Sequence, residues 1–318
     1  MNRILIIQTA FLGDVILATP LVSELHRLFP EAKIDFLLKK GNESLLQNNP
    51  KLNEVIIFDK SSGKWKSILR LIKQFRKNEY DLVINLHRFA SSGIIAGFSK
   101  GKKRYGFKKN PFSFLYTQKF AHKIGDGTHE VERNLSLIQE FGAKKLVRPE
   151  LFPSAEDNLH IEKYIAEEFY CLAPASVWFT KQLPKHKWVE LTESINNHSP
   201  LYLLGASGDS AFCKEIIADS KNKNVHSLCG ELTLLQSAAL MQKATRNFVN
   251  DSGPLHLASA VNANVTAFFC STIPDFGFGP LSENSDVKEV QDLDCRPCGL
   301  HGHQSCPKGH FKCGEITF

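Results

Sequence analysis

The sequence predicts an α/β protein made of two Rossmann-like domains, each built around a parallel sheet. Short apolar runs rich in β-branched residues alternate with stretches of helical period along the whole chain, a pattern typical of parallel strands joined by right-handed crossovers. At 318 residues the chain also exceeds what a single hydrophobic core usually holds. The segment 148–153, which contains two prolines, interrupts the alternation and predicts a linker. We therefore expect domains at 1–150 and 151–290 that face one another across a cleft, followed by a tail at 291–318.

The individual elements follow from the periodicity of apolar residues. In the first domain we expect strands at 4–7, 34–38, 55–58 and 82–85, with helices at 15–28, 65–76, 91–98 and 129–141. In the second domain we expect strands at 170–173, 201–204, 225–228, 247–249 and 265–269, with helices at 185–195, 210–220, 234–243 and 255–261. The two halves thus predict the same kind of sheet.

The two halves carry opposite net charges. The first 150 residues hold 26 Lys and Arg against 14 Asp and Glu, a net charge of +12, whereas the remainder has a net charge of −6. The densest basic stretch, 100–109, offers candidates to contact an anionic acceptor, namely Lys102, Lys103, Arg104 and Lys108. Such a stretch fits a phosphorylated saccharide, an anionic lipid headgroup or nucleic acid, and a solvated loop without a partner is the alternative.

The composition indicates a soluble protein of a reducing compartment. The hydrophobic fraction is 42%, and the eight cysteines follow no secretory framework. Gln8 and Asp14 interrupt the apolar start of the chain, which favours a buried strand over a signal peptide. Since no apolar run is long enough to span a bilayer, we expect a cytoplasmic protein, peripheral to the inner membrane.

Asp14 is the candidate catalytic residue of the first domain. It follows the first predicted strand, and ligands bind at the carboxyl ends of strands in open α/β sheets. The dipole of the following helix would keep the carboxylate ionised, so that it could take the proton from a sugar hydroxyl. Capping of that helix is the structural alternative, and the two roles are compatible.

Three loops of the second domain predict a site for a diphosphate. Ser176 and Lys181 follow the strand at 170–173, and Lys181 could neutralise the charge that grows on a departing phosphate. The Gly-rich turn 205–209 could lie against a base or a ribose, although neither loop matches the Gly-x-Gly-x-x-Gly or Walker patterns. The turn 250–254 opens a helix whose dipole and free N–H groups favour a phosphate, and an ordinary capped helix is the alternative.

Three motifs in this order resemble the ADP-heptose:lipopolysaccharide heptosyltransferases of glycosyltransferase family nine. They are the opening run 4–20, the loop 178–181 with Lys187-Trp188 after it, and Asn-Asp-Ser-Gly-Pro-Leu-His-Leu-Ala-Ser-Ala at 250–260. The order matches from Arg3 to about Pro280. The resemblance implies a GT-B fold, a phosphorylated lipid-linked saccharide acceptor on the N-terminal domain, ADP-heptose mainly on the C-terminal domain, and inversion without an obligatory metal.

The resemblance also implies roles for single residues. It places the general base at Asp14, and it places the donor site at Ser176, Val177, Lys181, Asp209, Asp251, Ser252, Gly253 and His256. Two positions depart from the family pattern and bear on the identity of the sugar. Val177 stands where a second hydroxyl or a small residue is usual, and Asp209 stands where a Glu often occurs.

The tail carries the spacing Cys-x2-Cys-x7-Cys-x6-Cys at Cys295, Cys298, Cys306 and Cys313. Four thiols at such a spacing fit a tetrahedral structural zinc ion in a loop-rich segment, and the alternatives are reduced thiols packed in the tail or a disulfide that forms only on exposure to air. Since four ligands leave no open position, we expect no catalytic metal there.

Two other functions fit parts of the sequence. A related glycosyltransferase could use another nucleotide sugar to build a different surface glycan. A basic zinc-containing nucleic-acid-binding protein would use the stretch 100–109 and the tail. The latter leaves the predicted phosphate sites unexplained, so we expect no nucleic-acid partner.

Overall fold

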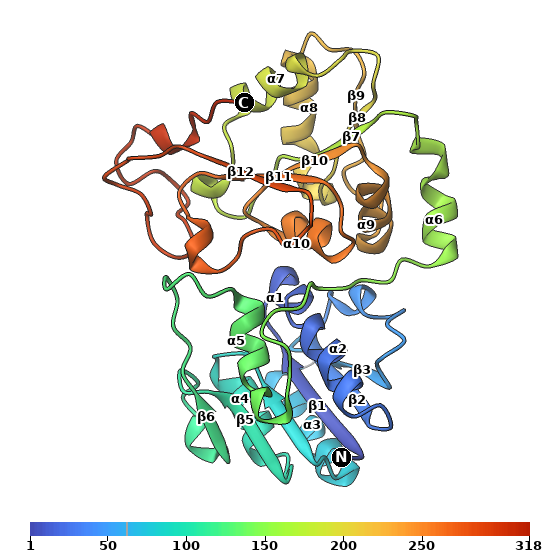
Figure 1. Ribbon diagram of the computed structural model, residues 1–318, viewed down its shortest axis with the longest axis vertical. Coiled ribbons are helices and arrows are strands. Elements are labelled where there is room, and N and C mark those ends of the chain that lie inside the picture. The colour runs from blue at the N-terminus through green and yellow to red at the C-terminus, as the bar shows by residue number, and fades with distance from the viewer. Residues whose placement is uncertain (62) are drawn as a thin grey trace. The chain divides into compact units, whose positions relative to one another are not determined.

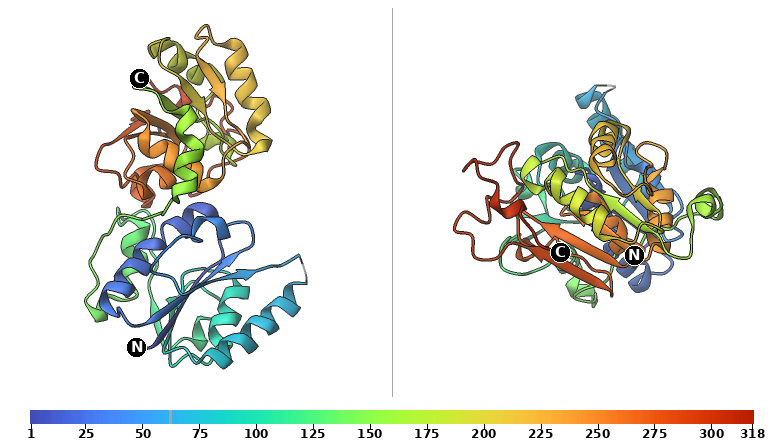
Figure 2. Two further views of the ribbon diagram at one scale, coloured as in Figure 1. Left: turned by 90° about the vertical axis from the view of Figure 1, so that its right-hand side faces the viewer. Right: turned by 90° about the horizontal axis from the view of Figure 1, so that it is seen from above.

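The computed structural model describes residues 1–61 and 63–318, which form two compact units. Unit 1 comprises residues 1–124 and 128–151, and unit 2 comprises residues 125–127 and 152–318. Each unit is a sheet with helices on both of its faces (Figure 1, Figure 2). The chain enters unit 2 at Gly125, returns to unit 1 at Thr128, and enters unit 2 again at Phe152.

Each unit contains a six-stranded parallel sheet, and the predicted α/β class is confirmed. The strand order is β3-β2-β1-β4-β5-β6 in unit 1 and β12-β11-β10-β7-β8-β9 in unit 2. The strands of unit 1 are β1 (Arg3–Gln8), β2 (Lys33–Lys39), β3 (Glu54–Phe58), β4 (Leu82–Asn85), β5 (Lys103–Phe107) and β6 (Gln118–Phe120). Those of unit 2 are β7 (Tyr170–Ala173), β8 (Leu201–Leu203), β9 (Val225–Ser227), β10 (Arg246–Asn250), β11 (Val265–Phe269) and β12 (Ser285–Glu289).

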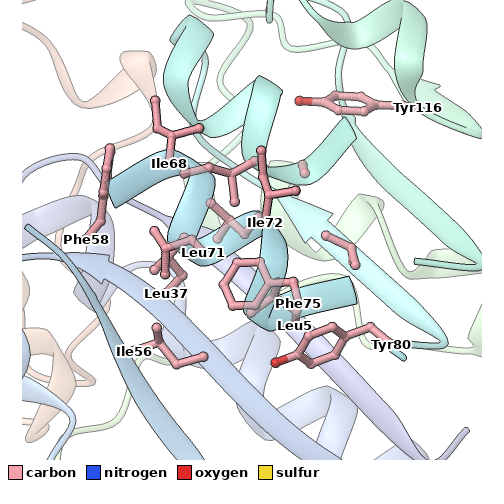
Figure 3. Packing of buried hydrophobic residues seen from close by; sticks show 14 residues of the cluster. Leu5, Leu37, Ile56, Phe58, Ile68, Leu71, Ile72, Phe75, Tyr80 and Tyr116 are labelled. Carbon is pink, nitrogen blue, oxygen red and sulfur yellow. The ribbon is translucent and has the colours of Figure 1, made fainter. Parts of the chain in front are cut away.

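Amphipathic helices cover the sheets. They are α1 (Leu12–Ile16), α2 (Thr19–Leu28), α3 (Lys64–Asn78), α4 (Ala90–Phe98), α5 (Glu130–Ser136), α6 (Ala155–Ile161), α7 (Lys185–Ser194), α8 (Ser210–Asp219), α9 (Leu234–Lys243) and α10 (Gly253–Ala260). In unit 1, Leu71 and Phe75 of α3 pack on Leu5 and Leu37 of the sheet, and all four are fully buried (Figure 3). Within the residues described, no helix is both long and apolar enough to cross a membrane.

The helix predicted at 15–28 is wrong in one respect, because the structure contains two helices there. The first ends at Ile16, and the second begins at Thr19 with Pro20 in its first turn. Proline has no N–H to donate inside a helix, so a new helix begins where this donor is not needed. The helix predicted at 129–141 is likewise shorter, since α5 ends at Ser136 and a 3-10 turn follows at Gln139–Phe141.

The sequence patterns missed three strands and one helix. The strands are β5, β6 and β12, and the helix is α6. All three strands lie at or next to the edge of a sheet, where they need not show the continuous apolar run of a central strand. In β5, for example, Lys103 is exposed while Tyr105 and Phe107 are buried. Its charged start therefore resembles a basic loop in the sequence.

The topology brings distant loops together at one edge of each sheet. In parallel sheets all carboxyl ends lie at the same edge, and ligands bind where the strand order reverses. That reversal lies between β1 and β4 in unit 1 and between β7 and β10 in unit 2. Asn250, at the end of β10, is fully buried and joins these loops. Its Nδ2 donates to the carbonyl of Pro174 at 2.9 Å, and its Oδ1 accepts from the N–H of Leu183 at 2.9 Å.

We expect Asn250→Ala to lower the free energy of unfolding by about 2–4 kcal/mol, because it leaves buried backbone groups without their partners. Equilibrium unfolding in urea measures this loss. Asn197→Ala, at an exposed position of the same unit, should change stability by no more than about 0.5 kcal/mol. Equal stabilities of the two variants would contradict the role assigned to Asn250.

Candidate functional site

Asp14 lies on α1, directly after the carboxyl end of β1. Its Oδ2 accepts a hydrogen bond from the backbone N–H of Phe11 at 3.1 Å, which fixes the carboxylate at the first turn of the helix. The backbone N–H of Asp14 itself also hydrogen-bonds to the carboxylate, and no side chain among the described residues donates to it. A general base needs a carboxylate oxygen within reach of the proton that it takes. The capping role of Asp14 is compatible with a role as base.

The electrostatic surroundings of Asp14 favour a proton acceptor that works near neutral pH. Burial raises the pKa of Asp14 to about 6, the charge of Glu130 adds to this effect, and Arg88 opposes it. Glu130 is itself buried, and burial raises its pKa. Hydrogen bonds from His122 at 3.1 Å and Arg133 at 2.7 Å outweigh that effect and hold the pKa of Glu130 below its usual value. The ionised Glu130 thus keeps the pKa of Asp14 high.

His87 supports the loop between β1 and α1. Its Nδ1 lies 2.8 Å from the hydroxyl of Thr9, which is buried at the end of β1. Burial lowers the pKa of His87 to about 4, with smaller effects from Lys60 and Arg88. The ring is therefore neutral at pH 7, and Nδ1 can accept the proton of Thr9.

Most of the basic stretch lies at the wrong edge of the sheet to meet Asp14. Lys103 pairs in register with Leu82, at the start of β4, so Lys102, Lys103 and Arg104 occupy the amino ends of the strands. Lys102 forms an ion pair with Asp81 at 2.7 Å, and Lys103 forms one with Glu140 at 3.2 Å.

Arg104 makes backbone contacts instead of binding an anion. Its guanidinium donates to the carbonyls of Leu115 at 3.0 Å and Gly101 at 2.6 Å. Of the four candidate acceptor cations, Lys108 follows the carboxyl end of its strand. Arg88, which sequence reasoning missed, follows the carboxyl end of β4, is exposed, and lowers the pKa of Asp14 through its charge. Its position after a predicted strand was the available signal.

In unit 2, Lys181 and Asp251 form an ion pair across the reversal of strand order. The distance from Nζ of Lys181 to Oδ2 of Asp251 is 2.7 Å, and both side chains are largely buried. The hydroxyl of Thr272, after β11, donates to the same Oδ2 at 2.6 Å. An ammonium group carries three donors, so the pair with Asp251 leaves Lys181 able to donate to a further acceptor.

The start of α10 has no side-chain cap. Ser252 stands at the N-cap position, but its side chain makes no capping hydrogen bond, so it leaves the first-turn amides to other partners. Gly253 and Pro254 begin the helix, and His256 is buried within it, with its ring centroid 6.4 Å from that of Phe278. Asp251 directly precedes this helix start, so Lys181 lies beside it.

The remaining donor candidates lie in exposed turns. The hydroxyl of Ser176 accepts from the N–H of Trp178 at a long 3.4 Å, and Val177 is 76% exposed. Asp209 accepts from the N–H of Ala206 at 2.8 Å, which closes the Gly-rich turn after β8. The structure thus gives Asp209 a local capping role and places Ser176 and Val177 in the loop that leads to Lys181.

The cysteine-containing tail packs against the loop of Lys181. The N–H of Thr180 donates to the carbonyl of His303 at 3.1 Å, and the N–H of His303 donates to the hydroxyl of Thr180 at 2.8 Å. Gly302 has φ +74°, and a Cβ there would lie 2.9 Å from Cγ of Lys181. Only glycine permits this close approach, so the tail packs directly against the loop that carries Lys181.

Arg296, between the first two tail cysteines, also supports the site. Its buried guanidinium donates to the carbonyl of Cys270 at 2.7 Å and to that of Thr272 at 2.6 Å. These bonds fix the segment that presents the hydroxyl of Thr272 to Asp251. No sequence signal separated this arginine from the surrounding cysteine pattern.

The four tail cysteines lie near one another. Burial raises the pKa of the Cys313 thiol to about 11, and the thiols of Cys298, Cys306 and Cys295 raise it further. Cys313 belongs to the hydrophobic core of unit 2. Among the residues that the structure describes, no three His, Cys, Asp or Glu side chains are arranged to hold a metal ion. The structural zinc ion therefore remains a prediction from the cysteine spacing.

Elemental analysis of the purified protein tests the zinc prediction. The spacing predicts about one zinc per chain, which Cys306→Ser should release. Cys171→Ser, buried in β7 away from the tail, should retain it. A metal-free protein with all eight thiols reactive after unfolding would leave only the alternative of packed thiols.

Comparison with known proteins identifies the family and the fold of this chain. The family model of glycosyltransferase family 9 (heptosyltransferase) matches residues 68–307. Lipopolysaccharide heptosyltransferase 3 of Escherichia coli K12 is 29% identical over 86% of this chain and 83% of its own. The structure of E. coli ADP-heptose LPS heptosyltransferase II aligns with a TM-score of 0.80 and 23% identity, covering 98% of this chain and 97% of the other.

A further structural relative was solved with a nucleotide. It is the E. coli heptosyltransferase WaaC with ADP, which aligns with a TM-score of 0.72 and 20% identity over 90% of this chain and 92% of its own. These structural likenesses establish the GT-B fold. The family model spans most of the sequence and includes both the Lys181 loop and the start of α10. The chain therefore belongs to glycosyltransferase family 9, the heptosyltransferases.

Proposed function

We propose that this chain transfers heptose from ADP-heptose to a phosphorylated, lipid-linked acceptor in the inner core of lipopolysaccharide, with inversion and with Asp14 as general base. The observation that carries the proposal is the Lys181–Asp251 pair beside the start of α10. The pair itself is neutral, but it holds the ammonium group of Lys181, which has further N–H donors, beside a helix start at the position in an α/β sheet where nucleotides bind. We infer heptose and ADP as the parts of the donor because the E. coli relatives are named as heptosyltransferases and one was solved with ADP.

The chemistry of the donor site follows from charge. When the bond between the anomeric carbon and the diphosphate breaks, negative charge grows on the departing ADP. Lys181, held in place by Asp251, would donate to that diphosphate, and the dipole of α10 would add a favourable field. Asp251 is a positioning residue in this scheme, since a carboxylate does not itself attract a phosphate. These groups neutralise the leaving group without an obligatory metal.

The acceptor side uses Asp14. The acceptor hydroxyl would lose its proton to the carboxylate of Asp14 while its oxygen forms the new bond to the anomeric carbon, and the electron pair of the broken bond would leave with ADP. Arg88 and Lys108 follow the carboxyl ends of β4 and β5, and in this proposal they would contact acceptor phosphates. We do not extend this role to Lys102, Lys103 or Arg104, because they lie at the opposite edge.

The proposal includes a cytoplasmic location at the surface of the inner membrane. Eight cysteines without a disulfide suit a reducing compartment, and a lipid-linked acceptor requires work at a membrane surface. The nucleic-acid-binding alternative is set aside, because family membership explains both candidate phosphate sites. Another nucleotide sugar remains the alternative donor, which a comparison of ADP, UDP and GDP binding distinguishes.

We expect Asp14→Asn to lower turnover by about 10²–10⁴-fold, as for loss of a general base, with ADP affinity unchanged. The raised pKa means that the folded protein ionises this carboxylate at a cost. Asp14→Asn should therefore leave the stability at neutral pH unchanged or raise it, so that lost activity is not lost folding. Asp59→Ala, which removes a partly exposed carboxylate paired with Lys40, serves as the control and should retain turnover.

The pH dependence of turnover should show the same group. A base with a pKa of about 6 is deprotonated above that pH, so kcat should fall as the pH decreases through 6 and be constant above it. A profile that is flat from pH 5 to 8 would contradict Asp14 as the base.

We expect Lys181→Ala to weaken ADP binding by about 10- to 100-fold, the loss typical of a charge-assisted hydrogen bond. Calorimetric titration of the purified protein with ADP, UDP and GDP measures this. Lys185→Ala, a cation of the same unit that pairs with Glu215 and Asp219, is the control and should bind ADP normally. Equal affinity of both variants, or preference for UDP or GDP, would contradict the proposed donor site.

A further inference from the structure

The outward side of α3 combines exposed apolar side chains with many cations. We define the α3 outer face as Lys64, Trp65, Lys66, Leu69, Arg70, Lys73, Arg76 and Lys77. Trp65 is 63% exposed and Leu69 is 67% exposed, although both are large apolar side chains. They are four residues apart and so lie on one stripe of the helix, which continues through Lys73. The opposite side of the helix is fully used by the core, where Ile68, Leu71, Ile72 and Phe75 are buried (Figure 3).

The cations of this face are available to a partner. Residues 64–78 contain six Lys and Arg and no Asp or Glu. Within the described part of the chain, none of the six forms an ion pair. Arg70 and Arg76 donate to the backbone carbonyls of Ile57 at 3.4 Å and Phe98 at 2.8 Å, which leaves their charges without a counter-ion. Lys102 and Lys103, in contrast, are already paired with carboxylates.

Further apolar surface adjoins the helix. Phe98, at the end of α4, is 43% exposed, and its carbonyl accepts from Arg76 of α3. Ile57, on β3, is 37% exposed and accepts in the same way from Arg70. Apolar side chains and cations therefore alternate over this part of unit 1. Exposed large apolar side chains on one surface are typical of an interaction site.

We propose that the α3 outer face docks on an anionic phospholipid bilayer. Trp65 and Leu69 would enter the boundary between headgroups and acyl chains, and Lys66, Lys73 and Lys77 would lie at the lipid phosphates. Charge complementarity selects this occupant, because tryptophan, leucine and lysine on one helix face are what an interfacial helix presents to anionic lipid. A second copy of this chain would bring the same six cations against one another, which is unfavourable. A nucleic acid would complement the cations but would not bury the side chain of Leu69.

The inference rests on the proposed function in one respect, namely that the acceptor is held in a membrane. It adds the surface that contacts the membrane, which lies on a different element from Asp14 and the cations proposed for the acceptor. Binding to vesicles needs neither donor nor acceptor, so the two proposals can fail separately.

Sedimentation of the full chain with lipid vesicles tests the docking surface. Vesicles of phosphatidylcholine alone are compared with vesicles that also contain phosphatidylglycerol. The unaltered protein should bind only the anionic vesicles. Both Trp65→Ser/Leu69→Ser and Lys66→Gln/Lys73→Gln should weaken that binding by about tenfold or more, given that each cation near an anionic surface contributes on the order of a fivefold change in affinity.

Matched control variants come from unit 2. Leu159, on α6, is 67% exposed, the same fraction as Leu69. Lys214, on α8, is exposed and unpaired among the described residues. Leu159→Ser and Lys214→Gln should bind the anionic vesicles like the unaltered protein. The tryptophan emission should shift to the blue on vesicle binding, and Trp65→Phe should abolish the shift while retaining binding.

Three results would overturn the docking surface. They are equal vesicle binding by the α3 variants and the controls, no preference of the unaltered protein for anionic vesicles, and a change of oligomeric state in the α3 variants with unchanged vesicle binding. Failure of the proposed function has another signature. In that case the unaltered protein transfers no heptose to a detergent-solubilised acceptor, whether or not it binds vesicles.

Discussion

The parallel direction of the strands is the constraint on which the rest of this structure depends. Parallel strands place every carboxyl end at one edge of a sheet, and the reversal of strand order opens a place for a ligand there. In unit 2 this reversal puts the loop after β7 beside the loop after β10. Lys181 and Asp251, seventy positions apart, can therefore form a buried ion pair. The side chain of Asn250 joins the same two loops through hydrogen bonds to backbone groups.

Charged side chains at these edges are stabilised by neighbouring side chains. Asp251 is compensated by Lys181 and Thr272, and Glu130 by His122 and Arg133. Asp14 differs, because Glu130 adds negative charge near a carboxylate that is already desolvated. Folding alone would not select such a pair. A role as a proton acceptor near neutral pH would explain why Asp14 lies near Glu130, and the ion pairs around Glu130 keep that carboxylate in position.

Two groups of cations in unit 1, those of the stretch 100–109 and those of α3, differ in their spacing along the sequence and in their partners. The stretch 100–109 has the highest local density of cations, but part of it forms β5, whose amino end provides partners in Asp81 and Glu140. The cations of α3 are more widely spaced in the sequence, since the helix turns every third or fourth residue inward. The density of cations along the sequence therefore suggests a binding surface at 100–109, where Lys102 and Lys103 are already paired with carboxylates. The helical spacing of the α3 cations makes their shared surface harder to recognise from the sequence.

The sequence by itself determined the α/β class, the central strands and the identity of the candidate base and anion-binding loops. These depend on local information: apolar runs for buried strands, and a polar turn before a helix for a ligand site. The edge strands β5, β6 and β12 and the division of α1 from α2 depended on neighbours that local patterns do not contain. Only the tertiary structure decided that Lys181 meets Asp251, that Glu130 raises the pKa of Asp14, and that the tail supports the Lys181 loop. Each of these is a contact between residues far apart in the chain, and the path of the backbone, rather than the spacing of the sequence, sets its distance.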